Sequence, residues 1–156
     1  MDMVKEWITP WRLHKMELKT ITSKLKQNNL YFKKINFKRS KEIPNNFNNS
    51  FDVNYEYENE NTITVELITK ITSKNKMSLE VILVGEFVLL EESNTIPEEE
   101  KKSILEKNTV AIMFPFLRSQ ITLITAQPNM PALNLPPLNI NALLENIKEK
   151  KKKAQK

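Results

Sequence analysis

The sequence is poor in the residue types that most often carry catalysis. It contains no cysteine, one glycine (Gly85) and one histidine (His14) in 156 residues. The absence of cysteine excludes disulfides and thiolate chemistry. A single glycine leaves no phosphate-binding loop, and a lone histidine gives no metal-ligand spacing. We therefore expect a protein that is not an enzyme and that holds no cofactor and no metal.

Long apolar runs are also missing. The longest, VAIMFPFL, has eight residues, which is too short to cross a bilayer. The first residues, MDMVKEWITPW, lack the apolar core and small-residue cleavage site of a secretory signal. These features predict a cytoplasmic protein with no integral membrane segment.

The formal net charge of +5 lies at the two ends of the chain. Residues 1–29 carry +3 and residues 148–156 carry +5, whereas residues 30–147 carry −3. Basic ends can bind nucleic acid, but they are more often solvated. We interpret residues 148–156 as a Lys-rich disordered tail. A nucleic-acid-binding module is the less favoured reading, because the expected sheet offers few exposed aromatic side chains for base stacking.

Residues 1–29 are expected to form an N-terminal helical extension. Apolar side chains recur at helical spacing from Val4 to Leu25. Thr9 followed by Pro10 is typical of an N-cap and a proline in the first helical position.

The next sixty residues predict four strands. Apolar and polar side chains alternate clearly in three segments and weakly in a fourth, around Tyr31–Phe37. The clear segments are Phe51–Tyr57, Ile63–Ile71 and Met77–Leu89. Short Asn-bearing connectors at 58–61 and 73–76 are typical of hairpins. We predict a four-stranded antiparallel meander sheet. The second face of the last strand is also apolar, so we expect it to be covered or to bind something.

Helical periodicity begins near residue 95. Thr95 and Pro97, followed by three glutamates, are typical of a helix start. We expect one helix to about Lys107 and another from Thr109 to about Ala126, with a kink or restart at Pro115. Apolar side chains surround more than half of the second helix, so one side should pack on the sheet and the other on a second copy. The predicted oligomer-interface residues are Phe114, Leu117, Ile121 and Ile124.

An apolar loop is predicted from Gln127 to Leu138. It holds four prolines with Met and Leu side chains, a composition that favours a binding surface when a loop is exposed. Asn139 should then cap a last helix, whose apolar face carries Ile140, Leu143, Leu144 and Ile147. The fold class is therefore α+β, with the helices packed on one face of the sheet.

Three segments resemble the SecB family of protein-export chaperones. FPFLR at 114–118 is similar to the family's FPYAR, and PALNLPPLN at 131–139 is similar to its PQLNLAPVN. EVILVGEF at 80–87 is similar to the end of the family's fourth strand. The resemblance covers about residues 30–147, a SecB-like chaperone domain. It implies a cytoplasmic homotetramer, a dimer of dimers, that takes part in protein transport and translocation by binding unfolded or precursor proteins without ATP.

The resemblance also implies a client-binding groove between the apolar loop and the second strand. The matching residues are Phe47, Phe51, Met130, Pro131, Leu133 and Leu135. One departure concerns the SecA motor, which the family docks with acidic residues on the outer sheet face. Here Lys34 and Lys38 occupy matching positions. SecA engagement is therefore uncertain, and a SecB-like chaperone dedicated to an antitoxin or another specific partner is the alternative.

Overall fold

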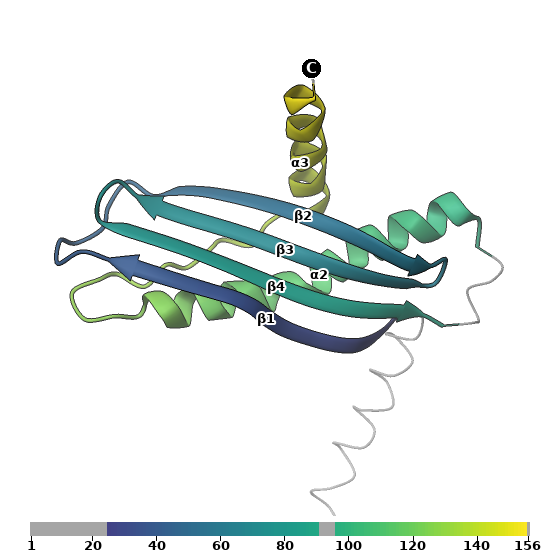
Figure 1. Cartoon of the computed structure of the whole chain (residues 1–156), viewed down its shortest axis with the longest axis horizontal. Helices are drawn as coiled ribbons and strands as arrows, with labels where there is room; N and C mark the ends of the chain where they lie inside the picture. Colours follow the sequence, from purple (N-terminus) through teal and green to yellow (C-terminus); the bar gives the residue numbers. More distant parts are fainter. Residues whose placement is uncertain (1–24, 91–95, 156) are drawn as a thin grey trace, which may run out of the picture.

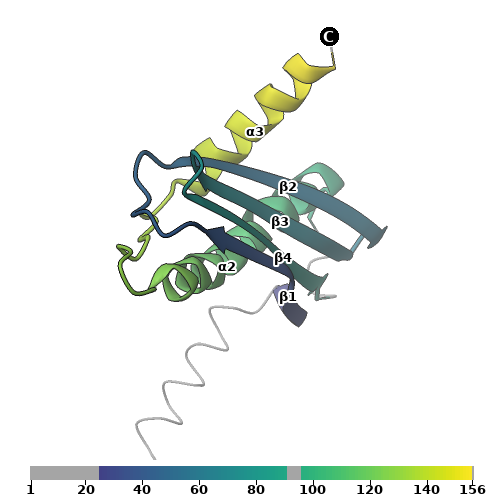
Figure 2. The same cartoon turned by 60° about the vertical axis from the view of Figure 1, so that its left-hand side comes forward.

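The chain folds into an antiparallel sheet with one long helix along a single face (Figure 1). The computed structural model describes residues 25–90 and 96–155. The strands and helices are β1 (Leu25–Arg39), β2 (Asn48–Asn59), β3 (Thr62–Ser73), β4 (Met77–Leu89), α2 (Glu98–Thr125) and α3 (Ile140–Ala154). Helix α2 lies along the sheet, whereas α3 projects away from it (Figure 2). The predicted α+β class is confirmed.

The strand order differs from a simple meander in one place. Strands β2, β3 and β4 follow one another through hairpins as predicted, but β1 pairs with β4 and gives the order β1-β4-β3-β2. The connection from β1 to β2 therefore crosses the β3–β4 turn. Ser40 N donates to Lys76 O at 2.8 Å, and Asn45 N donates to Ser73 Oγ at 3.1 Å. These contacts hold the connection across the end of the sheet.

The first strand begins earlier than the sequence pattern predicts. Leu25, expected on a helix, pairs with Leu89 at the far end of β4 and packs against the core. Residues 25–29 are thus in a strand, and their helical assignment was wrong. Backbone pairing with β4 outweighs the helical spacing of a few apolar side chains. The remainder of the predicted N-terminal helix, residues 1–24, lies outside the described residues.

Helix α2 is continuous, in contrast to the predicted break between two helices. It extends from Glu98 to Thr125 with Pro115 inside it. A proline removes one backbone hydrogen bond from a helix. Here its ring is on the exposed side, while Met113, Phe114 and Leu117 are buried on either side of it. Packing against the sheet therefore holds the helix together across the proline.

Helix α3 extends beyond the expected start of a tail at Lys148. Its N-cap is confirmed, because Asn139 Oδ1 accepts from Ala142 N at 3.2 Å. The helix continues to Ala154, so the described part of the predicted disordered tail is helical. Lysines in the last turn favour this extension, since positive charge is stabilising at the C-terminal end of a helix.

The core lies between α2 and the inner face of the sheet. Side chains at alternate positions of β3 and β4 are completely buried there, as the period-two pattern predicts. Gly85 of β4 lies in this core, close to Phe87 and to Met113 of α2. A Cβ at this position would lie 2.5 Å from Phe87 Cε2 and 3.0 Å from Met113 Sδ. Position 85 therefore requires glycine, because a larger residue would not fit there. Within the described ranges, no helix is both long and apolar enough to cross a membrane.

We predict that Gly85→Ala destabilises the fold by about 1–3 kcal/mol, the typical cost of overpacking a core. The added methyl group would collide with the buried ring of Phe87. Chemical denaturation would measure the loss. The matched control is Ser78→Ala, an exposed position on the same strand. Equal unfolding free energies for the two variants would contradict this view of Gly85.

Candidate functional site

The loop from residue 126 to residue 139 carries the predicted client-binding side chains. Met130 and Leu133 are half-buried and pack against the core, whereas Leu135 is buried and Pro131 is exposed. The loop therefore presents part of its apolar surface outward while its inner side is anchored. Leu135 has little surface left to offer a ligand.

Helix α2 fixes the backbone of this loop. Thr122 Oγ1 donates to Leu133 O at 2.9 Å, and Leu133 N donates to Thr125 Oγ1 at 2.8 Å. Thr125 in turn donates to Ile121 O at 2.7 Å and is fully buried. Both backbone groups of Leu133 are thus satisfied, which holds its side chain in place. The sequence did not predict the role of these two threonines, because nothing in it distinguishes them from other threonines that pack in a helix.

A second anchor comes from the end of β1. Arg39 donates to Pro128 O at 2.8 Å and to Asn129 O at 3.3 Å. Asn129 has a φ of 54°, a left-handed conformation that asparagine tolerates well. The loop is therefore fixed at its start by Arg39 and further along by α2. No sequence signal singles out Arg39, which stands in a strand rich in lysine.

The aromatic residues expected beside the loop lie on and before β2. Phe51 packs against Phe114 of α2 in an edge-to-face contact, with ring centroids 6.1 Å apart and an interplanar angle of 60°. Phe51 and Phe47 are half-buried against the same core as Met130 and Leu133. The structure therefore places both predicted sets of client-binding residues around one apolar core.

The residues predicted for an oligomer interface lie mainly inside the subunit. Phe114, Leu117 and Ile121 are buried in its own core, and Ile124 is half-buried. The exposed apolar side chains of α2 are Ile112 (36% exposed), Phe116 (50%) and Leu123 (66%). Their spacing of four and seven residues places them on one stripe. A surface cavity of about 530 Å³ lies on this side, lined by Pro115, Arg118, Ser119, Thr122 and Leu123. We call Ile112, Phe116 and Leu123 the α2 stripe.

The outer face of the sheet carries paired charges. Lys33 forms an ion pair with Glu66, and Lys34 forms one with Glu80. A hydrogen bond from Lys33 holds the pKa of Glu66 below its ordinary value, and Lys34 does the same for the pKa of Glu80. Val84, on the same face, is buried, and Ile82 and Val88 are half-buried. This confirms that the apolar side chains of β4 are partly covered.

A polar corner joins β2, α2 and α3. Tyr57 Oη donates to Glu106 Oε1 at 3.0 Å, and Tyr55 Oη donates to the backbone oxygen of Glu106 at 3.3 Å. Lys148 Nζ lies 3.4 Å from Glu106 Oε2. Burial raises the pKa of both tyrosines above its ordinary value, with a further contribution from Glu106. Neutral phenols therefore act here as structural donors.

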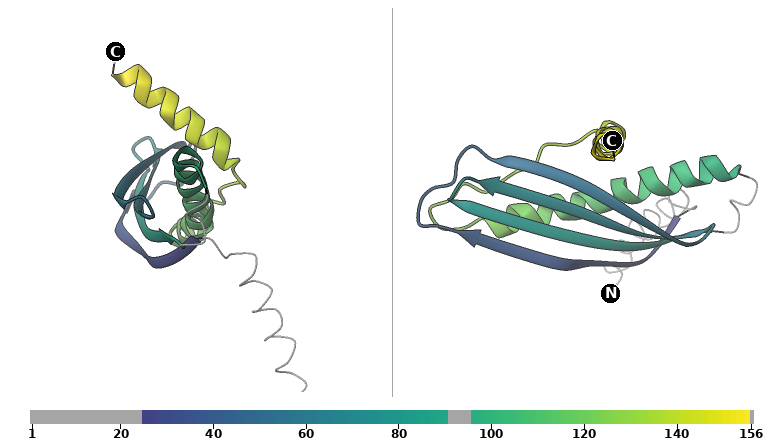
Figure 3. Two further views of the ribbon diagram at one scale, coloured as in Figure 1. Left: turned by 90° about the vertical axis from the view of Figure 1, so that its right-hand side faces the viewer. Right: turned by 45° about the horizontal axis from the view of Figure 1, so that its top comes forward.

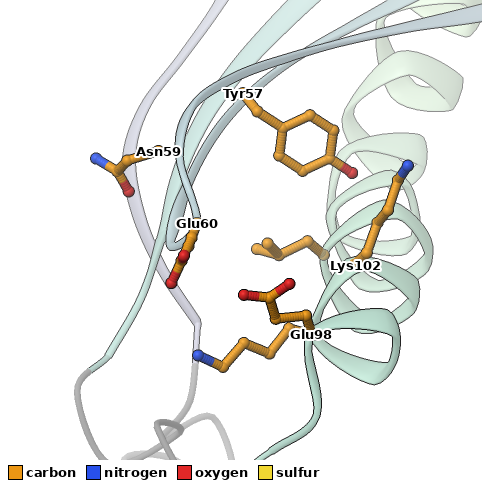
Figure 4. A pocket seen from close by; sticks show the side chains of 7 residues that line it. Tyr57, Asn59, Glu60, Glu98 and Lys102 are labelled. Atoms are coloured by element: carbon orange, nitrogen blue, oxygen red, sulfur yellow. The ribbon is translucent and has the colours of Figure 1, made fainter.

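Beside this corner lies a cavity of about 330 Å³ (Figure 4). Its lining residues are Tyr57, Asn59, Glu60, Glu98, Lys101, Lys102 and Leu105. The Lys102 ammonium lies 5.9 Å from the ring centroid of Tyr57. In residues 25–90 and 96–155, no three His, Asp or Glu side chains gather as a metal site would require. The apolar loop and the α2 stripe both present apolar side chains at the surface.

Comparisons with known proteins show what this chain is similar to. A model of the SecB family, described as preprotein translocase subunit SecB, matches residues 22–151. An uncharacterised protein of Methanocaldococcus jannaschii is 33% identical over 138 residues, covering 81% of this chain and 86% of that protein. Among solved structures, the Mycobacterium tuberculosis Rv1957 SecB-like chaperone, in complex with a ChAD peptide from the Rv1956 HigA1 antitoxin, matches with a TM-score of 0.61. That match has 10% identity and covers 76% of this chain and 94% of the other.

We predict that Lys33→Gln returns the pKa of Glu66 toward its ordinary value of 4.5. Because folding lowers this pKa, the ion pair stabilises the fold above about pH 4.5. This stabilisation is lost as the pH falls through the pKa that Glu66 has in the folded protein. An NMR pH titration of the Glu66 carboxyl would measure the change. Lys38→Gln is the control, since Lys38 has no ion-pair partner among the described residues. Identical Glu66 titration curves in the two variants would refute the assignment.

Proposed function

Because this chain belongs to the SecB family, we propose that it is a chaperone that holds unfolded or precursor polypeptides without ATP. The observation that carries the proposal is the anchored apolar loop. Hydrogen bonds from α2 and Arg39 hold its backbone, while Met130 and Leu133 remain partly exposed. An apolar surface kept in place by polar contacts suits the binding of non-native chains.

The mechanism rests on burial of apolar side chains of the client. Each contact contributes roughly 25 cal/mol per Å² of apolar surface, before the costs of ordering. Met130 adds a flexible side chain that adapts to different clients. Phe47 and Phe51 extend the apolar surface along the start of β2. Affinity then comes from several weak contacts along an extended segment, without a catalytic step.

We further propose that the subunits assemble into a cytoplasmic homotetramer, a dimer of dimers, through the α2 stripe. Ile112, Phe116 and Leu123 are large apolar side chains exposed on one side of a rigid helix. If the α2 stripes of two subunits packed against each other, these apolar side chains would be removed from water. Assembly also multiplies the client contacts, which raises avidity.

A second candidate is a chaperone dedicated to one partner, such as an antitoxin. The Mycobacterium tuberculosis structure with the same fold contains an antitoxin peptide, which motivates this reading. The outer face of the sheet also supports it. Lys33 and Lys34 neutralise the carboxylates of Glu66 and Glu80, so a basic docking segment of SecA would meet little free negative charge. The paired charges of the outer face therefore support client holding and argue against docking of SecA there.

We predict that Met130→Ser together with Leu133→Ser weakens client binding roughly thirtyfold, since each change removes about 1 kcal/mol of half-buried apolar contact. Suppression of the aggregation of an unfolded client measures the effect. Ala132→Ser is the matched control, because it adds a hydroxyl at an exposed position of the same loop. Unchanged suppression by the double variant, with assembly and stability intact, would overturn the proposed surface.

We predict that Phe116→Glu with Leu123→Glu dissociates the assembly. The change should raise the concentration for half-assembly roughly a hundredfold or more, because burying an unpaired carboxylate is costly. Analytical ultracentrifugation is the measurement. Lys107→Glu, an exposed change on another side of α2, controls for added negative charge. If both variants assemble like the unchanged protein, the α2 stripe is not the interface.

A further inference from the structure

The sheet has two edge strands, β1 and β2, and they differ in regularity. The pairing of β1 with β4 shifts register twice, at Gln27/Asn29 and at Phe32/Lys34. The pairing of β2 with β3 continues without a shift from Asn48 to Tyr57. Irregular edges resist further pairing, whereas a long regular edge is a template for another strand. Strand β2 is therefore the better edge for strand addition.

At the middle of β2 an ion pair occupies this edge. Val53 N donates to Asp52 Oδ1 at 2.8 Å, and Lys151 Nζ donates to Val53 O at 2.8 Å. Lys151 Nζ also lies 2.8 Å from Asp52 Oδ1. Both backbone groups of Val53 bond to charged side chains, so they face away from β3. The Lys151–Asp52 pair thus takes the hydrogen-bonding positions that an added strand would use.

A cleft of about 400 Å³ lies beside the ion pair. Strands β2 and β3 and helix α3 supply its walls, with Phe51, Ile68 and Ile147 as its large apolar residues. Helix α3 rises from the side of the sheet where β2 lies (Figure 3). Phe51, one of the predicted client-binding residues, is thus two residues from the covered backbone of Val53. The cleft can accept a side chain of a strand lying along this edge.

The end of α3 is held by weak contacts. Its buried side chains are Leu144 and Ile147, and residues 148–155 are all exposed. The side chains of Lys151 and Asp52 are 47% and 45% exposed, and ion pairs of this kind contribute little to stability. The last two turns can therefore leave the edge without uncovering the core, while Leu144 and Ile147 stay packed.

We propose that an extended client segment adds to the edge of β2 by backbone pairing, and that the Lys151–Asp52 pair is a displaceable cover of that edge. The proposal rests on the proposed chaperone function and names a site for its clients. In the absence of a client, the cover protects the regular edge from unspecific pairing. A client strand displaces Lys151 and takes the backbone groups of Val53.

The test compares Lys151→Met with Lys153→Met. Both remove one charge from α3 and keep the long stem, but Lys153 has no ion-pair partner in the described part of the chain. The probe is a fluorescent peptide of alternating Val and Thr, measured by anisotropy. A second peptide is N-methylated at alternate residues, which abolishes its backbone pairing. We expect Lys151→Met to bind the first peptide about two- to fivefold more tightly than Lys153→Met, in line with the loss of one exposed charged contact.

The N-methylated peptide should bind every form of the protein weakly and equally. Equal affinities of the two variants for the unmodified peptide would refute the role of the Lys151–Asp52 pair as a cover. Equal binding of the unmodified and N-methylated peptides would refute backbone pairing with β2. Failure of the chaperone function is a separate result. It would appear as no suppression of client aggregation by the unchanged protein, whatever the peptide affinities.

Discussion

The packing of α2 against the inner face of the sheet is the contact on which the rest of the molecule depends. Met113, Leu117 and Ile121 are fully buried there, and the absence of a side chain at Gly85 leaves room for the Phe87 ring and the Met113 thioether. This contact fixes the rotation of α2, and so decides which apolar side chains remain outside. It also positions the C-terminal end of the helix, whose threonines bind the apolar loop. One buried interface therefore sets the geometry of each exposed apolar surface.

The loop keeps apolar side chains partly exposed because its backbone is held by polar contacts. Free apolar side chains on a mobile loop would collapse onto the core and lose their surface. Here both backbone groups of Leu133 are bonded to α2, and Arg39 bonds two carbonyls at the start of the loop. The entropy of ordering the loop is thus lost on folding, not on binding, which favours affinity. The proposed cover at the edge of β2 acts in the opposite sense, because a client must displace the Lys151–Asp52 pair before it can bind there.

Patterns in the sequence predicted those structural features that depend on residues close together in the chain. Alternation gave the buried faces of β3 and β4, and Asn75, with a φ of 59°, occupies the predicted β3–β4 turn. The order of the strands was missed, because the choice of β4 as the partner of β1 depends on residues about fifty positions apart. The client-binding residues came from a family resemblance, and their anchors came only from the structure. For α2, composition predicted two apolar sides, but the rotation that buries Phe114 and exposes Phe116 depends on its fit to the sheet.

The distribution of positive charge argues against reading the basic termini as a nucleic-acid site. In the described part of the chain, Lys33 and Lys34 pair with carboxylates on the outer sheet face, and two lysines of the basic C-terminal segment, Lys148 and Lys151, pair with Glu106 of α2 and Asp52 of β2. Binding of phosphate by Lys148 or Lys151 would compete with these ion pairs. Tyr31 is the exposed aromatic residue of β1 beside Lys33, and one ring is a poor platform for stacked bases. We therefore interpret the basic helix α3 as a structural element, because Lys151 pairs with Asp52 at the edge of β2, where an extended polypeptide would lie.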